Sequence, residues 1–475
     1  MDKSRRSFLK SLAIGSGALA TGLPSLATVL PTSDEEVARS AVLEAANGNF
    51  NMCGYAAPRI DTVRVAIIGI GQRGTEAVKR LAAIDNVEIT ALCDKYPDRV
   101  TKAQRILSVN NLPPAREYHG NDGWKALCDN AAVDLVYTPT PWHLHTPIAI
   151  RAMKNGKHAA VEVPAAQTLD ECWELVETSE KTRRHCIILE NCCYDFFELL
   201  TLNMARQGLF GEIIHAEGAY IHDLSKEWLF NKDAYADMWR LRENIGHHGN
   251  LYPTHAIGPV AQCMNINRGD QLDHLVSMST RDFTLNAIAA ELAPTDPFFS
   301  EFTNRDYRGN INTTMIRTKK GKTIMLQHDV STPRPYSRIH LVSGTKGMAR
   351  KWPSPERIAF GHTWISQTQL DELYIKYSPP IVNHIGNIAK KMGGHGGMDF
   401  IMDWRLIDCL RNGLPPDQDV YDAAAWSCIV PLSSRSVLKK SRTVDIPDFT
   451  RKSWVTNKPV DLTLNGGGTT ILRPQ

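Results

Sequence analysis

The sequence predicts an α/β protein in two parts: an N-terminal doubly wound parallel sheet, then a C-terminal α+β domain with a large open, mostly antiparallel sheet. Strand-like and helix-like segments alternate from Val63 to Leu189, which is typical of a parallel sheet whose connections are helices. After Asp195 one helical segment is followed by several strand-like runs, which indicates that strands dominate the second part.

Apolar runs set the predicted elements of both parts. In the first part the predicted strands are Val63–Ile68, Val87–Leu92, Val133–Thr138, His158–Val161 and Cys186–Leu189. Between them Gly156 marks a helix C-terminus, and Thr168 to Glu171 forms a capping box that begins the next helix. In the second part we predict helices at Phe196–Gln207 and Phe400–Arg411, and strands at Ile213–Ile221, Asn310–Thr318, Thr323–His328 and Ser337–Ser343.

The first strand leads directly into a G-x-G-x-x-G motif formed by Gly69, Gly71 and Gly74. These glycines let the backbone turn tightly and approach a pyrophosphate, which then binds at the positive end of the following helix. Asp94 ends the second strand, where a carboxylate accepts from a ribose 2′-OH and repels a 2′-phosphate. The motif alone also fits an incidental turn, but the complete strand–helix–strand–acid order predicts a Rossmann domain over residues 62–195 that binds NAD rather than NADP.

Composition argues against several classes of function. With 475 residues and 43% hydrophobic side chains, the chain is ordinary globular material. Its formal net charge is +3, and the first ten residues alone account for that excess. The remainder is close to neutral, so we predict neither nucleic-acid binding nor attraction to an anionic membrane surface.

Residues 1–30 are predicted to be an export signal. Ser4-Arg5-Arg6-Ser7-Phe8-Leu9-Lys10 precedes a weakly apolar segment rich in Gly and Ala, and Ser25 to Ala27 offers a cleavage site. This resembles a twin-arginine signal, which exports folded proteins and implies a periplasmic location. A retained membrane anchor is the alternative, although the glycines and Pro24 of this segment weaken a spanning helix. The signal would be the chain's sole link to the membrane.

The remaining organisation follows from composition. Residues 31–61 are polar and predict a linker or surface strap, residues 196–450 a substrate-binding α+β domain, and residues 451–475 a tail that packs on the domains. The ten cysteines fall mostly in apolar strand and helix patterns, so we expect small core residues rather than disulfides. A protein that folds in the reducing cytoplasm before export needs no disulfide framework.

The segment from Thr138 to Pro164 resembles the glucose-fructose oxidoreductase and inositol dehydrogenase superfamily. It contains a Pro-containing loop with His145, a helix, Gly156-Lys157-His158 and then Glu162-Val163-Pro164. In dehydrogenases of that superfamily the triplet is Glu-Lys-Pro, and the lysine works beside the hydroxyl that is oxidised. Val163 can neither donate nor accept a proton, so this chain departs from a plain dehydrogenase.

Four further motifs make the resemblance more specific: Asn191 to Asp195, Gly249 to His255, Pro333 to Ser337 and Gly394 to Asp399. In this order they resemble glycoside hydrolase family 109, the NAD-dependent α-N-acetylgalactosaminidases. The resemblance implies a cofactor site for NAD made by Gly69, Gly71, Gln72, Arg73, Gly74, Asp94, Trp142, His145, Glu162, Val163, Asn191 and Tyr252. It implies a sugar site made by Tyr220, Arg240, Tyr252, Pro253, Thr254, His255 and Tyr336.

Several of these residues also fit plainer roles. Trp142 and His145 could be loop packing, Arg240 a surface salt bridge, Tyr336 a strand aromatic and His255 a capped loop histidine. The adjacent pair His247-His248 suggests a metal, but no acid or histidine completes a site at usable spacing, so we predict none.

The resemblance also implies a mechanism. Hydrolysis of a glycoside consumes no electrons, so an NAD that takes part must be reduced and reoxidised within each turnover. Oxidation at C3 of the sugar acidifies the C2 proton, elimination releases the aglycone from C1, water adds, and C3 is reduced again. His255, Tyr194 and Glu162 are the candidate acid/base residues, without individual roles assigned.

The alternatives are an exported NAD-dependent sugar or inositol dehydrogenase, and a non-catalytic sugar-binding protein on the same fold. In either glycosidase or dehydrogenase, the partner is a glycan or glycoside. In this superfamily an exposed sheet often pairs with another subunit, which leaves a homodimer open beside a monomer.

Overall fold

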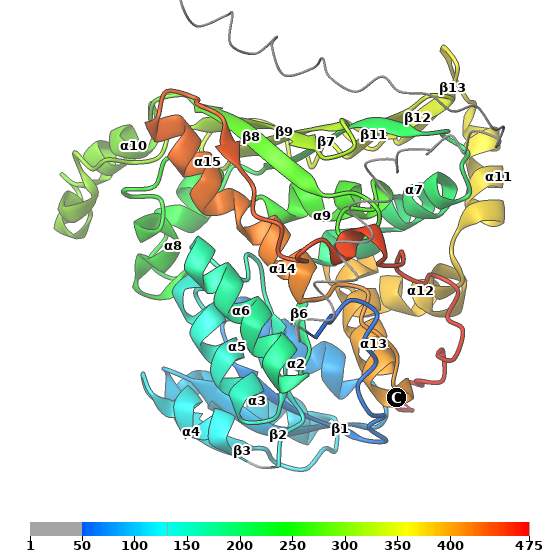
Figure 1. Cartoon of the computed structure of the whole chain (residues 1–475). Helices are drawn as coiled ribbons and strands as arrows, with labels where there is room; N and C mark the ends of the chain where they lie inside the picture. Colours follow the sequence, from blue (N-terminus) through cyan, green and yellow to red (C-terminus); the bar gives the residue numbers. More distant parts are fainter. Residues whose placement is uncertain (1–49, 131, 475) are drawn as a thin grey trace, which may run out of the picture.

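A computed structural model describes residues 50–130 and 132–474 (Figure 1). The predicted signal and most of the predicted linker lie outside the described residues. The first domain holds a six-stranded sheet in the order β3-β2-β1-β4-β5-β6, with every pair parallel. Its strands are β1 (Val63–Ile68), β2 (Val87–Asp94), β3 (Arg116–His119), β4 (Leu135–Thr138), β5 (His158–Val161) and β6 (Cys186–Ile188). The predicted doubly wound parallel sheet is confirmed.

Helices connect these strands and fix the position of a crevice. They are α2 (Gln72–Ala82), α3 (Pro97–Val109), α4 (Gly123–Asp129), α5 (His145–Lys154) and α6 (Leu169–Thr182). The predicted capping box is present, since Thr168 accepts from the Glu171 amide and Glu171 accepts from the Thr168 amide. Strand order runs outward in opposite directions from β1 and β4, and ligands of such sheets bind at this switch point, beyond the carboxyl ends of the strands.

The second domain holds a nine-stranded sheet in the order β14-β13-β12-β11-β7-β10-β9-β8-β15. Its strands are β7 (Ile213–Ile221), β8 (Leu272–Ser279), β9 (Ile311–Thr318), β10 (Thr323–Asp329), β11 (Leu341–Gly344), β12 (Gly347–Arg350), β13 (Arg357–Phe360), β14 (Thr363–Trp364) and β15 (Val444–Asp445). Only β7 and β10 pair in parallel among these described strands, so the predicted open, mostly antiparallel sheet is confirmed.

One predicted strand begins too early. The sequence pattern placed a strand at Ser337–Ser343, but β11 starts at Leu341. Ile339 and His340 have positive φ angles of 57° and 44°, a conformation that an extended strand cannot contain. The apolar alternation therefore begins before the residue at which strand β11 begins.

Helices of the second domain lie mainly between the two sheets (Figure 1). They are α7 (Phe196–Arg206), α8 (Trp239–Arg242), α9 (Thr254–Cys263), α10 (Leu285–Leu292), α11 (Gln367–Tyr377), α12 (Pro380–Met392), α13 (Met398–Asn412), α14 (Val420–Ser427) and α15 (Ile429–Leu438). Helix α9 packs against β7, β10 and β11, and α15 packs against β8. This arrangement brings the N-terminus of α9 toward the switch point of the first sheet.

Helix α13 packs against β1 and α2 of the first domain. Its fully buried Asp403 accepts from Arg80 Nε at 2.7 Å and from the Tyr137 hydroxyl at 3.0 Å. The predicted boundary near Asp195 therefore divides the sequence, whereas in space α13 takes part in the packing of the first domain.

The C-terminal tail lies along the first domain. Asp85 N donates to Ile471 O at 2.9 Å, and Trp404 Nε1 donates to Thr470 O at 3.0 Å. Near the other end of the described chain, Ile60 N donates to Leu410 O. Both ends of the described chain therefore form backbone contacts with other elements, and the bounds of the linker and the tail stay predictions.

The ten cysteines are all free thiols, and all except the partly buried Cys53 are buried, which confirms their prediction as core residues. Among residues 50–130 and 132–474, no helix is both long and apolar enough to span a membrane.

Candidate active site

A cavity of about 360 Å³ lies at the switch point of the first sheet, beneath the second domain. Its first-domain lining comprises Gly69, Gly71, Gln72, Arg73, Glu76, Pro139, Thr140, Pro141, Trp142, His145, Glu162, Val163 and Asn191. Its second-domain lining comprises Tyr220, His222, Leu224, Trp228, Ala234, Tyr235, Ala236, Trp239, Arg240, Tyr252, His255, Gly394, His395 and Asp399. Most predicted cofactor and sugar residues therefore meet in one cavity.

Glycine is required at the three positions of the loop for different physical reasons. A Cβ at Gly74 would lie 1.9 Å from Gly69 O, and a Cβ at Gly69 would lie 2.8 Å from Thr140 Cγ2, so the protein's own packing requires both. At Gly71 a Cβ would meet only Arg99 Nη1, at 3.8 Å. Packing leaves room there, and this room faces the cavity, as expected where a pyrophosphate approaches the backbone. The loop thus fits a dinucleotide.

Asp94 has a second role in this loop. Its Oδ2 accepts from Ile70 N at 2.6 Å and its Oδ1 accepts from Tyr96 N at 2.9 Å, so it holds the glycine loop in place. A carboxylate has about four acceptor positions, which leaves capacity for a ribose hydroxyl. The predicted ribose contact stays a prediction.

Arg73 joins the loop to both domains. Its guanidinium binds Glu162 Oε1 at 2.5 Å and Asp399 Oδ2 at 2.8 Å. His395 Nδ1 lies 2.8 Å from the same Asp399 oxygen. Burial opposes ionisation of Asp399, but Arg73, the His395 hydrogen bond and Arg80 outweigh it and hold the pKa of this carboxyl well below its ordinary value. Glu162 is thus ion-paired with Arg73 through Oε1 while it lines the cavity, and its role as an acid or base stays a prediction.

His145 and Trp142 pack against neighbouring groups and also line the cavity. His145 is buried between two carbonyls, with Nδ1 2.7 Å from Pro164 O and Nε2 2.8 Å from Thr140 O. Burial lowers its pKa although both carbonyls favour a proton. The Trp142 ring stacks on Tyr252 at 5.7 Å between centroids. His145 thus braces two loops, while Trp142 forms a wall shared with the sugar side.

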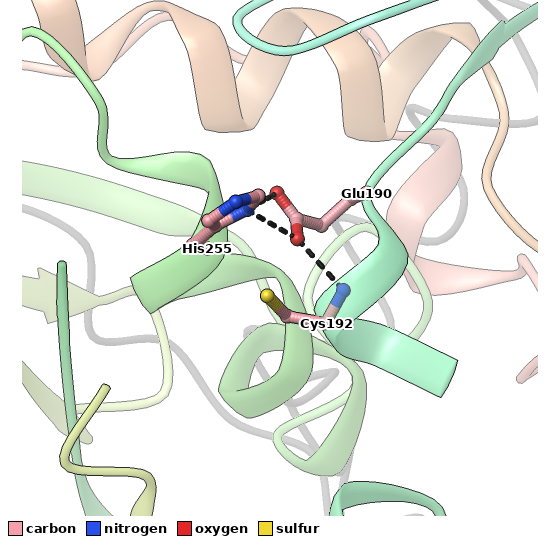
Figure 2. A group of neighbouring side chains, drawn as sticks. All are labelled: Glu190, Cys192 and His255. Carbon is pink, nitrogen blue, oxygen red and sulfur yellow. Dashed lines mark hydrogen bonds and ion pairs between the residues drawn. The ribbon is translucent and has the colours of Figure 1, made fainter. Parts of the chain in front are cut away.

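His255 lies in the first turn of α9 with its ring against a buried carboxylate (Figure 2). Its Nδ1 is 2.7 Å from Glu190 Oε1 and 2.9 Å from Oε2. The rings of Tyr252 and Tyr220 meet it edge to face at 4.8 and 5.4 Å. His255 is therefore a cavity residue with a carboxylate partner in the first turn of a helix, which argues against the alternative of a capped loop histidine.

Arg240 presents an unneutralised charge to the cavity. Its guanidinium lies over the rings of Trp142, Tyr235 and Tyr252, and Nη1 donates to Tyr235 Oη at 2.8 Å. Within the described ranges, no carboxylate pairs with Arg240, so the alternative of a surface salt bridge is wrong. A guanidinium packed on aromatic faces and free of a counter-ion suits an anionic or strongly polar ligand atom.

Six predicted residues do not line the cavity: Gly74 and Asp94, whose packing is given above, and Tyr194, Pro253, Thr254 and Tyr336. The buried Tyr194 hydroxyl donates to Asp417 Oδ2 at 3.2 Å in the core, which corrects its prediction as a catalytic group. Pro253 caps α9 and Thr254 is fully buried in its first turn, so both support their neighbours. Tyr336 lies before β11 rather than in a strand, and its ring touches His222, a lining residue, at 5.1 Å.

Two family models match this chain. The model described as "Glycosyl hydrolase 109, C-terminal domain" matches residues 194–456, and that described as "Oxidoreductase family, NAD-binding Rossmann fold" matches residues 63–189. A glycosyl hydrolase family 109 protein 1 of Bacteroides fragilis strain YCH46 is 48% identical, over 86% of this chain and 89% of that protein. The chain belongs to glycoside hydrolase family 109.

Another relative, named alpha-N-acetylgalactosaminidase, comes from Bacteroides fragilis strain ATCC 25285; it is 48% identical over 85% of this chain and 96% of its own length. Solved structures share the fold at lower identity. An aldose-aldose oxidoreductase from Caulobacter crescentus aligns with a TM-score of 0.57 at 18% identity, over 81% of this chain and 100% of its own. A levoglucosan dehydrogenase in complex with NADH aligns at 0.58 and 18%, over 82% and 100%. This family 109 chain is therefore a glycoside hydrolase, and its cofactor is NAD.

Sequence reasoning missed several lining residues of this family 109 enzyme. They are His222, Trp228, Tyr235, Trp239, His395 and Asp399, together with Glu190 behind His255. Asp399 and His395 belong to the Gly394–Asp399 motif, which was available as a signal. Glu190 directly precedes the Asn191 motif, but nothing in its local pattern indicates a partner 65 residues away.

The group Glu190, Cys192 and His255 presents ligand-type atoms within 4.8 Å of one another. Hydrogen bonds account for the grouping, because Glu190 Oε1 accepts from both Cys192 N and the His255 ring. Burial raises the pKa of the Cys192 thiol well above its ordinary value, which disfavours the thiolate that a metal requires. This donor set fits a metal poorly.

Proposed function

We propose that this family 109 enzyme removes terminal α-linked N-acetylgalactosamine from glycosides by oxidation, elimination, addition and reduction, with no net redox change. The observation that carries the proposal is that His255 and Arg240 share one cavity with the dinucleotide loop, while Val163 stands where a dehydrogenase has lysine. The sugar and linkage are supported by the Bacteroides fragilis relative named alpha-N-acetylgalactosaminidase.

When bound, NAD would accept a hydride from C3 of the sugar while a base of the site takes the 3-hydroxyl proton, and both would return when C3 is reduced in the same turnover. The chain must then remove the C2 proton, which the adjacent C3 carbonyl has made acidic. His255 Nε2 is our choice for this base, since Nδ1 is occupied by Glu190 and the ring lines the cavity. The guanidinium of Arg240 stabilises negative charge that develops on the enolate oxygen.

Tyr220 and Tyr252 supply hydrogen-bond donors beside His255. Burial raises the pKa of both hydroxyls above the ordinary tyrosine value, so they stay protonated at neutral pH. A neutral phenol can donate to the sugar ketone or to the departing oxygen. No pair of carboxylates flanking the glycosidic bond is needed for elimination, in contrast to hydrolysis through an oxocarbenium ion.

A sugar dehydrogenase is the competing function, because the fold is shared with a levoglucosan dehydrogenase. Val163 removes the acid/base group that such chemistry uses, which disfavours it. A non-catalytic sugar-binding protein is disfavoured by the buried carboxylate behind His255. Purified enzyme with p-nitrophenyl α-N-acetylgalactosaminide separates the three functions: aglycone release without net NADH supports our proposal, net NADH a dehydrogenase, and binding alone a lectin-like role.

We also propose export through the twin-arginine pathway to the periplasm, supported by the Ser4 to Lys10 motif.

Pairing of two copies through the open face of the large sheet is a further proposal. Met315 and Met325 are paired across β9 and β10, and Met278 lies on the same face of β8, opposite Thr313; Met278 is 66% and Met315 38% exposed. Light scattering would give twice the 52.9 kDa chain mass for a dimer and 52.9 kDa if the proposal is wrong.

A further inference from the structure

Glu190 is a fully buried carboxylate that enters the proposed mechanism only as the partner of His255 Nδ1. It follows β6 and caps the 3-10 helix Asn191–Tyr194. Its backbone is held at both polar groups, because Glu190 N donates to Gln418 Oε1 at 3.0 Å and Gln418 Nε2 donates to Glu190 O at 2.9 Å. A buried charge fixed in this way costs free energy unless strong donors compensate it.

The compensation comes mainly from His255. Both carboxylate oxygens lie within 2.9 Å of His255 Nδ1, and Oε1 also accepts from Cys192 N at 3.0 Å. In the part of the chain that the structure describes, no lysine or arginine pairs with Glu190. Burial opposes ionisation, but His255 and the Cys192 amide outweigh it and lower the pKa of the Glu190 carboxyl. The carboxylate is therefore ionised, and the basic side chain that it faces is the His255 imidazole.

The close approach of the two residues depends on a glycine one turn along α9. A Cβ at Gly258 would lie 2.8 Å from Glu190 Cγ and 3.1 Å from Cys193 Sγ. Any larger side chain would push α9 away from the end of β6. The backbone of the helix is thus built to bring the His255 ring onto the carboxylate.

An ionised carboxylate can only accept, so the nitrogen that faces it must carry the proton. His255 is then held with Nδ1–H directed to Glu190 and with the Nε2 lone pair left for the cavity. We propose that Glu190 is a positioning residue that fixes this tautomer and stabilises the imidazolium formed when His255 Nε2 takes a proton from the sugar. The proton moves from sugar carbon to Nε2, Nδ1 keeps its own, and Glu190 stays ionised throughout.

Other groups around His255 do not supply the same effect. Tyr220 faces it from β7, His222 from just after β7, Tyr252 from the loop before α9, and Cys192 from the 3-10 helix. Among the described residues, no charged side chain of α7, α14, β10 or β11 forms an ion pair or hydrogen bond with His255. Arg240 lies beyond the Tyr252 ring and would disfavour an imidazolium. Glu190 is the group that stabilises the His255 imidazolium against this effect of Arg240.

The test is Glu190→Gln in the full-length, NAD-loaded enzyme. Glutamine can still accept from Nδ1–H but carries no charge, so the imidazolium loses its counter-ion. We expect kcat to fall about 10²-fold with KM within about threefold of wild type. The acid limb of the kcat–pH profile should move at least about one unit lower, because the base holds its proton less tightly. Glu190→Asp keeps the charge and should recover part of kcat and the original profile.

Glu180→Gln is the matched control, because Glu180 is also buried but pairs with Arg451 outside the cavity. It should change neither kcat nor the profile. If Glu190→Gln lowers thermal stability yet keeps the wild-type kcat and profile, Glu190 is merely structural and the proposal is wrong.

This inference rests on the proposed function, so it also needs a readout without substrate. In enzyme with 15N-labelled histidine, the His255 resonances, assigned by their loss in His255→Gln, should report a proton on Nδ1 at neutral pH. Glu190→Leu should lose that tautomer preference. A wild-type protein with Nε2 protonated would overturn the inference, whereas a correct tautomer in a protein without glycosidase activity would count against the proposed function alone.

Discussion

Arg73 and Asp399 form an ion pair across the cofactor cavity, with Nη1 2.8 Å from Oδ2 and a separation of 326 positions in the sequence. The same guanidinium binds Glu162, and the same carboxylate accepts from His395 and Asn191. One short network thus fastens the glycine loop of the first domain to the start of α13 in the second.

Replacement of Asp399 by Asn should speed loss of bound NAD by about tenfold, since the neutral amide weakens a charge-assisted contact by about 1.4 kcal/mol. NAD that remains after timed dialysis would be measured by denaturing the protein and quantifying the nicotinamide. Asp134→Asn is the control, because Asp134 pairs with Arg64 within the first domain. An Asp399→Asn enzyme that keeps NAD as long as the control would contradict a fastening role.

The same pair predicts a pH dependence of stability. The folded pKa of Asp399 is depressed, so its stabilising contribution is present above the unfolded value of about 3.9 and is lost as pH falls toward the folded value. Asp399→Asn should therefore be less stable than wild type at pH 7, and the gap should narrow below about pH 4. Urea titrations at pH 7, 5 and 3.5 would measure the difference in free energy of unfolding between wild type and variant. A difference that stays constant with pH would contradict the predicted contribution of Asp399.

Gly71→Ala should weaken NAD binding while it leaves the fold intact. Gly71 has φ −74° and ψ −157°, which alanine adopts readily, and its Cβ would meet protein no closer than 3.8 Å. The added methyl would instead occupy space needed by the pyrophosphate. We expect NAD content to drop and the melting temperature of NAD-free protein to change little. Gly123→Ala, in α4 and outside the cavity lining, should retain NAD.

Elimination across C1 and C2 requires loss of the C2 proton. Product formed in heavy water should therefore carry deuterium at C2, and a 3-deoxy or 3-O-methyl glycoside should be inert. Thioglycosides should still be cleaved, because departure of sulfur depends on the C2 anion rather than on protonation. His255→Ala should lower kcat by about 10² or more. NMR of the released sugar decides the matter: hydrogen kept at C2 together with turnover of the 3-deoxy substrate would exclude the redox route.

Export should depend on Arg5 and Arg6 as a pair. A double Lys substitution keeps the charge but removes the two guanidinium groups that define the motif. We expect enzyme to accumulate inside the cell, as measured by immunoblots of periplasmic and cytoplasmic fractions. Lys3→Arg, which alters the same charged stretch, serves as the control, and an unchanged periplasmic amount in the double variant would reject the twin-arginine proposal.

The sequence predicts the first domain well because its signals are local. The apolar run of β1, the glycines and the acid at the end of β2 lie within a 32-residue stretch whose order has a single physical explanation. Strand β3 escapes prediction because Arg-Glu-Tyr-His contains one buried side chain, Tyr118, at a sheet edge. Edge strands need no apolar run, so periodicity cannot detect them.

The candidate site is only partly predictable for a related reason. His255 stands in a distinctive motif, but its partner Glu190 comes from a different strand end and is defined by tertiary packing alone. Tyr194 shows the opposite failure, since it lies within a motif of the site yet points to Asp417 in the core. Motifs indicate which segments meet, and packing decides which side chains of those segments face the ligand.

The burial of Asp403 against Arg80 and Tyr137 has a consequence for biosynthesis. As the ribosome releases the chain, the NAD-binding sheet emerges some 200 residues before the helix that supplies this carboxylate. Until residue 412 has left the exit tunnel, the Arg80 guanidinium and Tyr137 hydroxyl have no acceptor in their final positions. The nascent first domain therefore lacks the Asp403 contacts of Arg80 and Tyr137 until α13 has been synthesised.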